Sequence, residues 1–250
     1  AYAGKGTFRT TAGILKDLSK GRINRVQDRI KVLIQKRKDP FDTFDKITQI
    51  AEQYPETRCF WLLADFGTYN KNLSYTNPQQ GEIISKLSSA CEIGIHPGYE
   101  TYMNATNLAL EIHRLTSLTK KEIKISRQHF LRLSIPETYN HLIEQHIQID
   151  YSMGYAETTG FRMGTARQTP WFNLITNEIT SLQLQPFCYM DGTLNEYMKL
   201  SPNQAIEEVK RLKALVKEYG GTFSFIWHNE TLGFKHHWKT WEPMFEESIK

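Results

Sequence analysis

Short apolar runs alternate with amphipathic stretches over most of this chain. The apolar runs predict strands at 59–64, 92–95, 124–130, 147–152, 184–190 and 222–227. Apolar residues at helical spacing predict helices at 81–89, 104–118, 136–145 and 202–219. Because strands and helices repeat at intervals of about thirty residues, we expect a parallel sheet that is covered by helices.

Residues 1–57 have a different pattern. Apolar residues recur at helical spacing over 11–36 with an interruption at Gly21, which predicts two helices or one broken helix. Asp39 and Pro40 suit a helix cap and first turn, so a further helix is expected to about Tyr54. We therefore divide the chain into a basic helical segment, 1–57, which packs on a strand-and-helix domain, 58–250.

The number of predicted strands limits the architecture of that domain. Six strands are too few for the standard eight-stranded barrel, so the sheet is either open or a distorted barrel short of strands. The interval 151–183 shows no clear helical period and is rich in Gly, Thr and Arg. We interpret it as a long loop, and loops of this length in compact domains are usually functional.

Charge is distributed unevenly along this globular chain, in which no apolar run approaches the roughly 20 residues of a membrane span. The net charge is +4, but residues 1–38 hold eleven Lys or Arg against two Asp, a sum of +9, so the remainder sums to −5. Such a basic stretch suits phosphates or an anionic surface, and a solvated helical face is the alternative. We favour the solvated face, without a nucleic-acid partner, because no recognition motif accompanies the charges.

Cysteine usage and the first residues bear on where the protein works. Cys59, Cys91 and Cys188 are odd in number and widely spaced, which predicts reduced thiols and favours a cytoplasmic location. The opening AYAGKGTFRT has neither an initiator Met nor the apolar core of a signal peptide, so we expect the sequence to start inside a longer protein.

The stretch EIGIHPGYE, 92–100, is where the pattern first points to chemistry. A buried strand is expected to stop at His96, because Pro97 and Gly98 neither extend a ladder nor begin a helix. In α/β folds, ligands bind at the carboxyl ends of parallel strands. His96 is therefore either a functional imidazole or a hydrogen-bonded loop residue, and this stretch alone does not decide between them.

Other predicted strands also end in polar side chains. These are Asp65, Arg127, His129, Asp150, Asp191, His228, Asn229 and Glu230. Each has a structural explanation of its own, such as a turn cap for the aspartates or an ion pair for the arginine. The whole set is harder to explain that way, because buried strands seldom end repeatedly in ionisable groups unless these face a shared cleft.

In order and spacing, these motifs resemble the polysaccharide deacetylase (NodB-homology) superfamily, in particular its divergent bacterial branch. The similar segments are CFWLLADFG, EIGIHPGYE, ISRQHFLRL, IDYSMGYAETTGFRMGT and FSFIWHNE, and the resemblance covers nearly all of the chain from about Asp39. It implies an α/β fold, a distorted (β/α) barrel of about seven strands with six in this chain. It also implies a metal-dependent hydrolase that removes an N- or O-acetyl group from a sugar or polysaccharide.

The resemblance further implies roles for individual residues. His228 is the expected general acid, and Arg127 and Asp150 are expected to orient or tune the catalytic groups. A carboxylate such as Asp150 would hold one ring nitrogen of His228 and raise its pKa. The expected substrate contacts are Arg162, Tyr99, Trp227 and Asn229.

The expected metal site departs from the family pattern. His96 is the expected ligand of a divalent metal, which we take to be zinc. Glu100 stands where the family has a second His, so either Glu100 or His129 is the second ligand. The family's strand with its Asp pair, the base and a further ligand, would lie before Ala1. The alternative function is therefore a catalytically inactive carbohydrate-binding module on the same barrel.

Overall fold

The structure is a computed structural model that describes residues 6–36 and 38–250. Its helices are α1 (Gly6–Ser19), α2 (Ile23–Leu33), α3 (Phe44–Gln53), α4 (Pro78–Ala90), α5 (Ala105–Thr119), α6 (Glu137–Glu144), α7 (Pro202–Tyr219) and α8 (Glu242–Ile249). Its strands are β1 (Arg58–Trp61), β2 (Glu92–Ile95), β3 (Ile125–Ser126), β4 (Ile149–Asp150), β5 (Thr169–Asn173) and β6 (Glu178–Leu184). Short helical turns follow several strands, at η1 (Tyr99–Met103), η2 (His129–Leu131), η3 (Thr193–Tyr197) and η4 (His236–Trp238).

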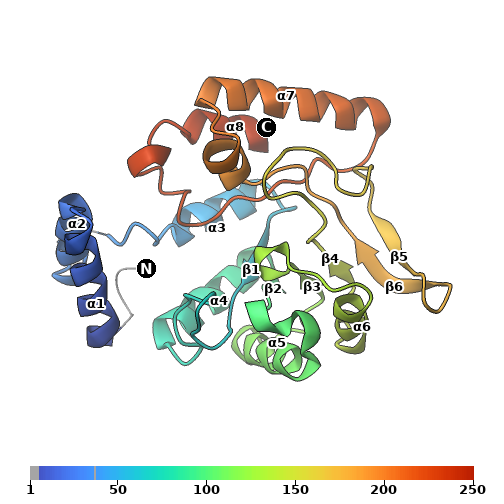
Figure 1. Cartoon of the computed structure of the whole chain (residues 1–250), viewed down its shortest axis with the longest axis horizontal. Coiled ribbons are helices and arrows are strands. Elements are labelled where there is room, and N and C mark those ends of the chain that lie inside the picture. The colour runs from blue at the N-terminus through green and yellow to red at the C-terminus, as the bar shows by residue number, and fades with distance from the viewer. Residues whose placement is uncertain (1–5, 37) are drawn as a thin grey trace.

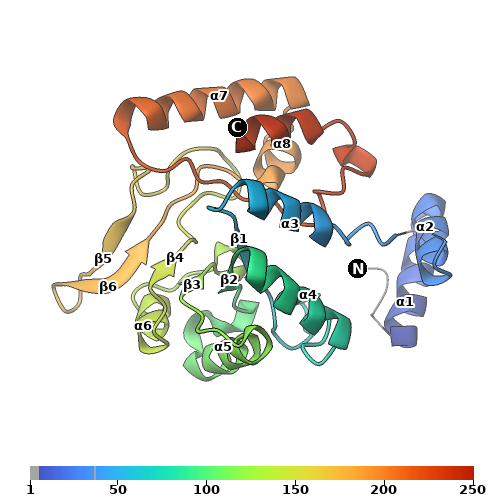
Figure 2. The same cartoon turned by 180° about the vertical axis from the view of Figure 1, so that it is seen from behind.

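A single six-stranded sheet, in the order β1-β2-β3-β4-β6-β5, runs through the molecule. All neighbouring pairs are parallel except β5 and β6, which form an antiparallel hairpin at one edge. Figures 1 and 2 show α4, α5 and α6 on one side of the sheet, with α3, α7 and α8 on the other. The predicted parallel sheet between helical layers is confirmed, whereas the described residues do not show a closed barrel.

Two buried clusters hold these layers together. The first joins β2 to α4, α5 and α6 through fully buried side chains, among them Ile95, Ile84, Leu115 and Leu142. The second lies under α7 and α8 and consists of Cys188, Tyr189, Leu194, Ala205, Val209, Leu212, Trp238, Trp241 and Met244. Burial of aliphatic and aromatic groups on one face of each helix is what fixes the helices to the sheet.

Two extended segments beyond β6 run side by side without forming a regular strand pair. Cys188 N–H donates to Ser224 O at 2.8 Å, and Ile226 N–H donates to Tyr189 O at 3.0 Å. Met190 and Ile226 form a parallel bridge. This pairing brings the residues that follow, Asp191 and His228, next to each other.

The region from 151 to 190 differs from the sequence-based expectation. The predicted loop 151–183 contains β5 and most of β6, and the strand predicted at 184–190 shares only Leu184 with β6. The alternation of apolar and polar residues that marks a strand is obscured here, because apolar residues are also exposed. Leu174 and Ile175, at the turn of the β5–β6 hairpin, are 84% and 78% exposed. A two-residue period is recognisable only when apolar side chains lie on the buried face alone.

Helices α4 to α7 lie within three residues of their predicted bounds. The helix predicted to begin at Asp39 and Pro40 instead begins at Phe44, with Thr43 at the cap position, because Asp39 accepts from Phe41 N–H in a turn before the helix. α7 begins and ends as expected, because Ser201 and Gln204 form a capping box and Gly220 ends the helix. The predicted break at Gly21 separates α1 from α2. α3 packs on the sheet, where Phe44 stacks on Trp61 with ring centroids 5.7 Å apart. The division into two domains stays a prediction.

The three cysteines are free thiols, as expected. In the described part of the chain, we find no helix with the length and apolar character that a membrane crossing needs.

Candidate active site

His96 follows β2 directly and is fixed by the neighbouring strand segments. Its backbone N–H donates to Trp61 O at 2.9 Å, and its ring Nδ1 lies 2.6 Å from Arg127 O. A carbonyl oxygen only accepts, so Nδ1 carries the proton and Nε2 keeps a free lone pair. Burial, helped by the nearby charges of His129 and Arg127, lowers the pKa of His96 to about 3. The imidazole is therefore neutral at physiological pH.

His129 lies beside His96, with ring centroids 4.9 Å apart at 63°. Its Nδ1 is 3.2 Å from Asn70 Oδ1, which also accepts from Tyr99 N–H at 3.0 Å. The Nδ2 of Asn70 donates to Glu100 Oε2 at 2.6 Å. Burial lowers the pKa of His129, so this ring too has a neutral form with Nε2 available.

The histidine pair suits a divalent transition metal in ligand type but not in ligand number. Neutral imidazole nitrogens are common zinc ligands, and catalytic zinc normally takes three protein ligands. Glu100 is engaged by Asn70. Among residues 6–36 and 38–250, no group of three or more His, Cys, Asp or Glu side chains is placed to hold a metal ion. Metal binding by His96, His129 and Glu100 therefore stays a prediction.

The second centre of the site is a hydrogen-bonded pair, Asp191 and His228. Asp191 is completely buried, and its Oδ1 lies 2.5 Å from His228 Nδ1. Its Oδ2 accepts the His228 backbone N–H at 3.0 Å and the Thr231 hydroxyl. A carboxylate in this position fixes the tautomer with Nδ1–H, so His228 Nε2 is the atom that exchanges protons.

Electrostatics sets the proton affinity of His228. Burial acts to lower its pKa, but the charge and hydrogen bonds of Asp191 outweigh this and raise the pKa above its ordinary value. Burial likewise opposes the charge of Asp191, but His228 keeps the pKa of that carboxyl low. The charge of His228 in turn helps to lower the pKa of both His96 and His129. The three imidazoles are therefore within electrostatic reach of one another.

Asp150 is the last residue of β4, and Arg127 directly follows the neighbouring strand β3. Asp150 is fully buried and accepts from Ser126 Oγ at 2.7 Å, Ser152 Oγ at 2.9 Å and Ser152 N–H at 2.9 Å. Asp191 thus holds the ring that we expected Asp150 to hold. Arg127 lies 4.1 Å over the Phe60 ring and donates from Nε to Tyr151 O at 3.3 Å. Burial lowers the pKa of Arg127 to about 10, so it stays a cation.

The chain is similar to known proteins in structure, but its sequence matches no described family. No family model matches the chain, and no curated protein sequence matches it. Among solved structures it is similar to the crystal structure of a putative polysaccharide deacetylase from Mycobacterium smegmatis. The TM-score is 0.58, and the match covers 94% of this chain and 77% of that one at 12% identity. The chain shares that protein's fold. At this identity the likeness concerns the fold alone, and it supports the α/β class of the expected fold but not closure of a barrel.

The expected substrate contacts are distributed unevenly over this fold. Tyr99 lies beside the histidine pair and stacks on Tyr69, with centroids 4.0 Å apart. Asn229 instead donates from Nδ2 to Phe41 O at 3.1 Å. Trp227 packs against Phe245, with ring centroids 4.9 Å apart, at the edge of the second cluster. Arg162 is exposed in the segment before β5. Their contacts with substrate stay predictions.

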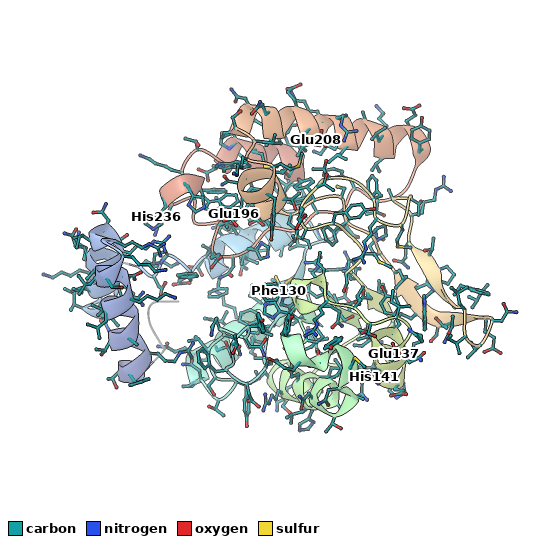
Figure 3. The ribbon with its side chains drawn as sticks, in the orientation of Figure 1. Phe130, Glu137, His141, Glu196, Glu208 and His236 are labelled. Atoms are coloured by element: carbon teal, nitrogen blue, oxygen red, sulfur yellow. The ribbon has the colours of Figure 1, made fainter. Side chains whose placement is uncertain are left out.

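Two aromatic residues that pack on Tyr99, namely Phe130 and Tyr69, are not among the residues that the sequence pointed to. Phe130 is 63% exposed and Tyr69 47% exposed, and both pack on Tyr99. Phe130 has a left-handed backbone, with φ of 57°, a strained conformation for a bulky residue that is typical of functional sites. Figure 3 shows Phe130 between the layer of α4 to α6 and the layer of α3, α7 and α8. The only signal in the sequence is the aromatic residue directly after His129.

Proposed function

We propose that this chain is a deacetylase-like hydrolase that removes an N- or O-acetyl group from a sugar or polysaccharide, with His228 as the proton donor. The observation that carries the proposal is the buried Asp191 carboxylate, which orients His228 through Nδ1 at 2.5 Å and raises its pKa. The deacetylase fold of the structural neighbour supports it.

The chemistry needs a proton donor of this kind. When an acyl group leaves a sugar nitrogen or oxygen, the departing atom must gain a proton, and imidazolium near neutral pH supplies one efficiently. Asp191 keeps the His228 Nδ1 proton in place, so the proton that moves is the one on Nε2. The side chain of His228 is 52% exposed, and a substrate can therefore reach it.

The aromatic side chains beside His129 suit a substrate with a sugar ring. Tyr69, Tyr99 and Phe130 form an aromatic surface next to His129, and aromatic faces commonly pack on the apolar faces of ring substrates. Arg132 lies 4.1 Å over the Tyr99 ring and holds it from the other side. We infer that this surface places a sugar residue with its acyl group toward His96 and His228.

A divalent metal is the cofactor that we propose, with His96 and His129 as the nitrogen ligands that the described residues offer. When bound, such an ion polarises an acyl carbonyl. His96 Nε2 and His129 Nε2 suit this role because burial lowers the pKa of both rings, which favours the neutral form that ligates a metal.

The test is release of acetate from a panel of N-acetylated and O-acetylated oligosaccharides. The protein is assayed after chelation and after addition of Zn²⁺, Co²⁺, Mn²⁺ or Mg²⁺ in turn. We expect acetate release that chelation abolishes and one of these ions restores. If no substrate of the panel releases acetate with any ion, the proposal is wrong.

A second function is favoured by one observation, namely that the ligating groups of the described residues are too few for a metal centre. On that account the fold is a carbohydrate-binding module that has lost catalysis. Calorimetry distinguishes the two: binding of an oligosaccharide that a chelator leaves unchanged, without turnover, supports the module.

A further inference from the structure

The hairpin of α1 and α2 leaves many large apolar side chains in solvent. Phe8 is 86% exposed, Leu15 61%, Ile23 50% and Ile30 44%. The other exposed apolar residues of the hairpin are Leu18, Leu33 and Ile34. Single exposed apolar residues are ordinary, but seven on one small helical hairpin are typical of an interaction surface.

These residues form a stripe on each helix. Both helices carry the same spacing of i, i+7 and i+10, which puts the three positions on one helical face. The positions are Phe8, Leu15 and Leu18 in α1, and Ile23, Ile30 and Leu33 in α2. We call these six side chains the apolar stripe. Phe8 and Leu15 lie on the face of α1 opposite Asp17, which contacts α2, and so they face away from α2.

Cations border the apolar stripe. Residues 6–36 contain eight Lys or Arg and two Asp, a net charge of +6. Lys16 directly follows Leu15 and Lys31 directly follows Ile30, and both lysines are exposed. Asp17 is buried against Arg29 at 2.8 Å, so this acid adds no negative charge at the surface.

The Asp17–Arg29 ion pair also makes the hairpin a defined unit, because it links α1 to α2. Gly13 leaves the space for it: a Cβ there would lie 2.9 Å from Arg29 Nη1. Figures 1 and 2 show the hairpin at the outer edge of the molecule, beyond α3. Arg9 ties it to the loop before α4, where its guanidinium lies 3.9 Å over the Phe66 ring. In the described structure, the six side chains of the stripe are between 42% and 86% exposed.

We propose that the α1–α2 hairpin docks the protein on an anionic lipid surface. The apolar stripe enters the interface, while Lys16, Lys31 and the other cations meet the acidic headgroups. A second copy of this chain is a less suitable partner, because its docking would bring together two segments that each carry a net charge of +6. A nucleic acid accounts for the cations but leaves the exposed apolar side chains unexplained. The proposal departs from the solvated face that the sequence favoured, because the hairpin exposes large apolar side chains as well as cations.

Co-sedimentation with vesicles tests this proposal. One set of vesicles is pure phosphatidylcholine, and the other contains 30% phosphatidylglycerol (about one anionic lipid in three). We expect binding to the anionic vesicles only, weakened by salt. The double variant Lys16→Gln/Lys31→Gln lowers the partition coefficient about fivefold for each cation removed. Leu15→Gln/Ile30→Gln lowers it by at least about tenfold.

Matched controls separate the hairpin from general surface effects. Lys217→Gln/Lys239→Gln makes the same charge change at exposed sites elsewhere. Leu174→Gln/Ile175→Gln makes the same polar change at the exposed β5–β6 turn. Both controls should bind like the unaltered protein, and circular dichroism should show all four variants folded.

Three results would overturn the proposal. The first is no binding of the unaltered protein to anionic vesicles at low salt. The second is equal loss of binding in the hairpin variants and the controls. The third is a dimer by light scattering that Leu15→Gln/Ile30→Gln dissociates, which would assign the stripe to a second copy.

Discussion

Asp191 binds His228 twice, through the ring Nδ1 at 2.5 Å and through the backbone N–H at 3.0 Å. The carboxylate therefore fixes both the position of the residue and the orientation of its ring. Asp191 is completely buried, and its charge and hydrogen bonds outweigh the effect of burial on the pKa of His228. This arrangement gives His228 a defined proton-exchanging atom, Nε2, and a raised pKa.

Replacing Asp191 by Asn should lower the pKa of His228. The substitution removes the negative charge that stabilises the imidazolium form. Titration of the ring followed by NMR should show a midpoint below that of the unaltered protein. Asp45→Asn, at an exposed carboxylate of α3, is the control and should leave the midpoint unchanged. An unchanged midpoint in Asp191→Asn would show that Asp191 does not control His228.

His228 and His96 should affect stability with opposite dependence on pH. The raised pKa of His228 gives a contribution that is full below its ordinary pKa of 6.5 and is lost as pH rises through the folded value. The pKa of His96, lowered to about 3, gives a contribution that is full above 6.5 and declines as pH falls toward 3.

Urea unfolding of metal-free protein between about pH 4 and about pH 9 measures this difference. The free energy of unfolding that His228→Gln loses should shrink as pH rises. The loss in His96→Gln should instead shrink as pH falls. Slopes of the same sign for both variants would contradict the assigned charge states.

Gly94 should tolerate no side chain, because it lies where β2 is packed on both sides. A Cβ there would lie 2.7 Å from both Ile125 Cγ1 and the Phe60 ring. Gly94→Ala should therefore lower the free energy of unfolding by about 1–3 kcal/mol. Gly81→Ala in α4 is the matched control, since its Cβ would meet only the flexible end of Leu118 at 3.3 Å. An equal loss of stability in both would mean that strand packing is not the cause.

The sequence predicted those features that depend on neighbouring residues. The capping signals of Ser201 and Pro202 place α7, and the stop at Pro97 places His96 after β2. The sequence also pointed to His228, because this residue directly follows the apolar run 222–227. Local periodicity and caps are short-range properties that a single sequence displays directly.

The partners of these residues were not predictable, because they are distant in the chain. Asp191 and His228 meet only because the segments before them pair, and Asp150 was an equally reasonable candidate from spacing alone. Asn70, which joins His129 to Glu100, lies in a loop without any motif. Such contacts follow from the packing of the sheet, which strand patterns do not specify.

The most direct test of the proposed function compares two histidine variants in the acetate-release assay. His228→Asn should lower kcat about 10²–10⁴-fold, the usual contribution of one positioned proton donor, with binding of oligosaccharide retained. His113→Asn, at an exposed site on α5, is the control and should keep full activity. If His228→Asn releases acetate as fast as His113→Asn, His228 is not the proton donor and the account is contradicted.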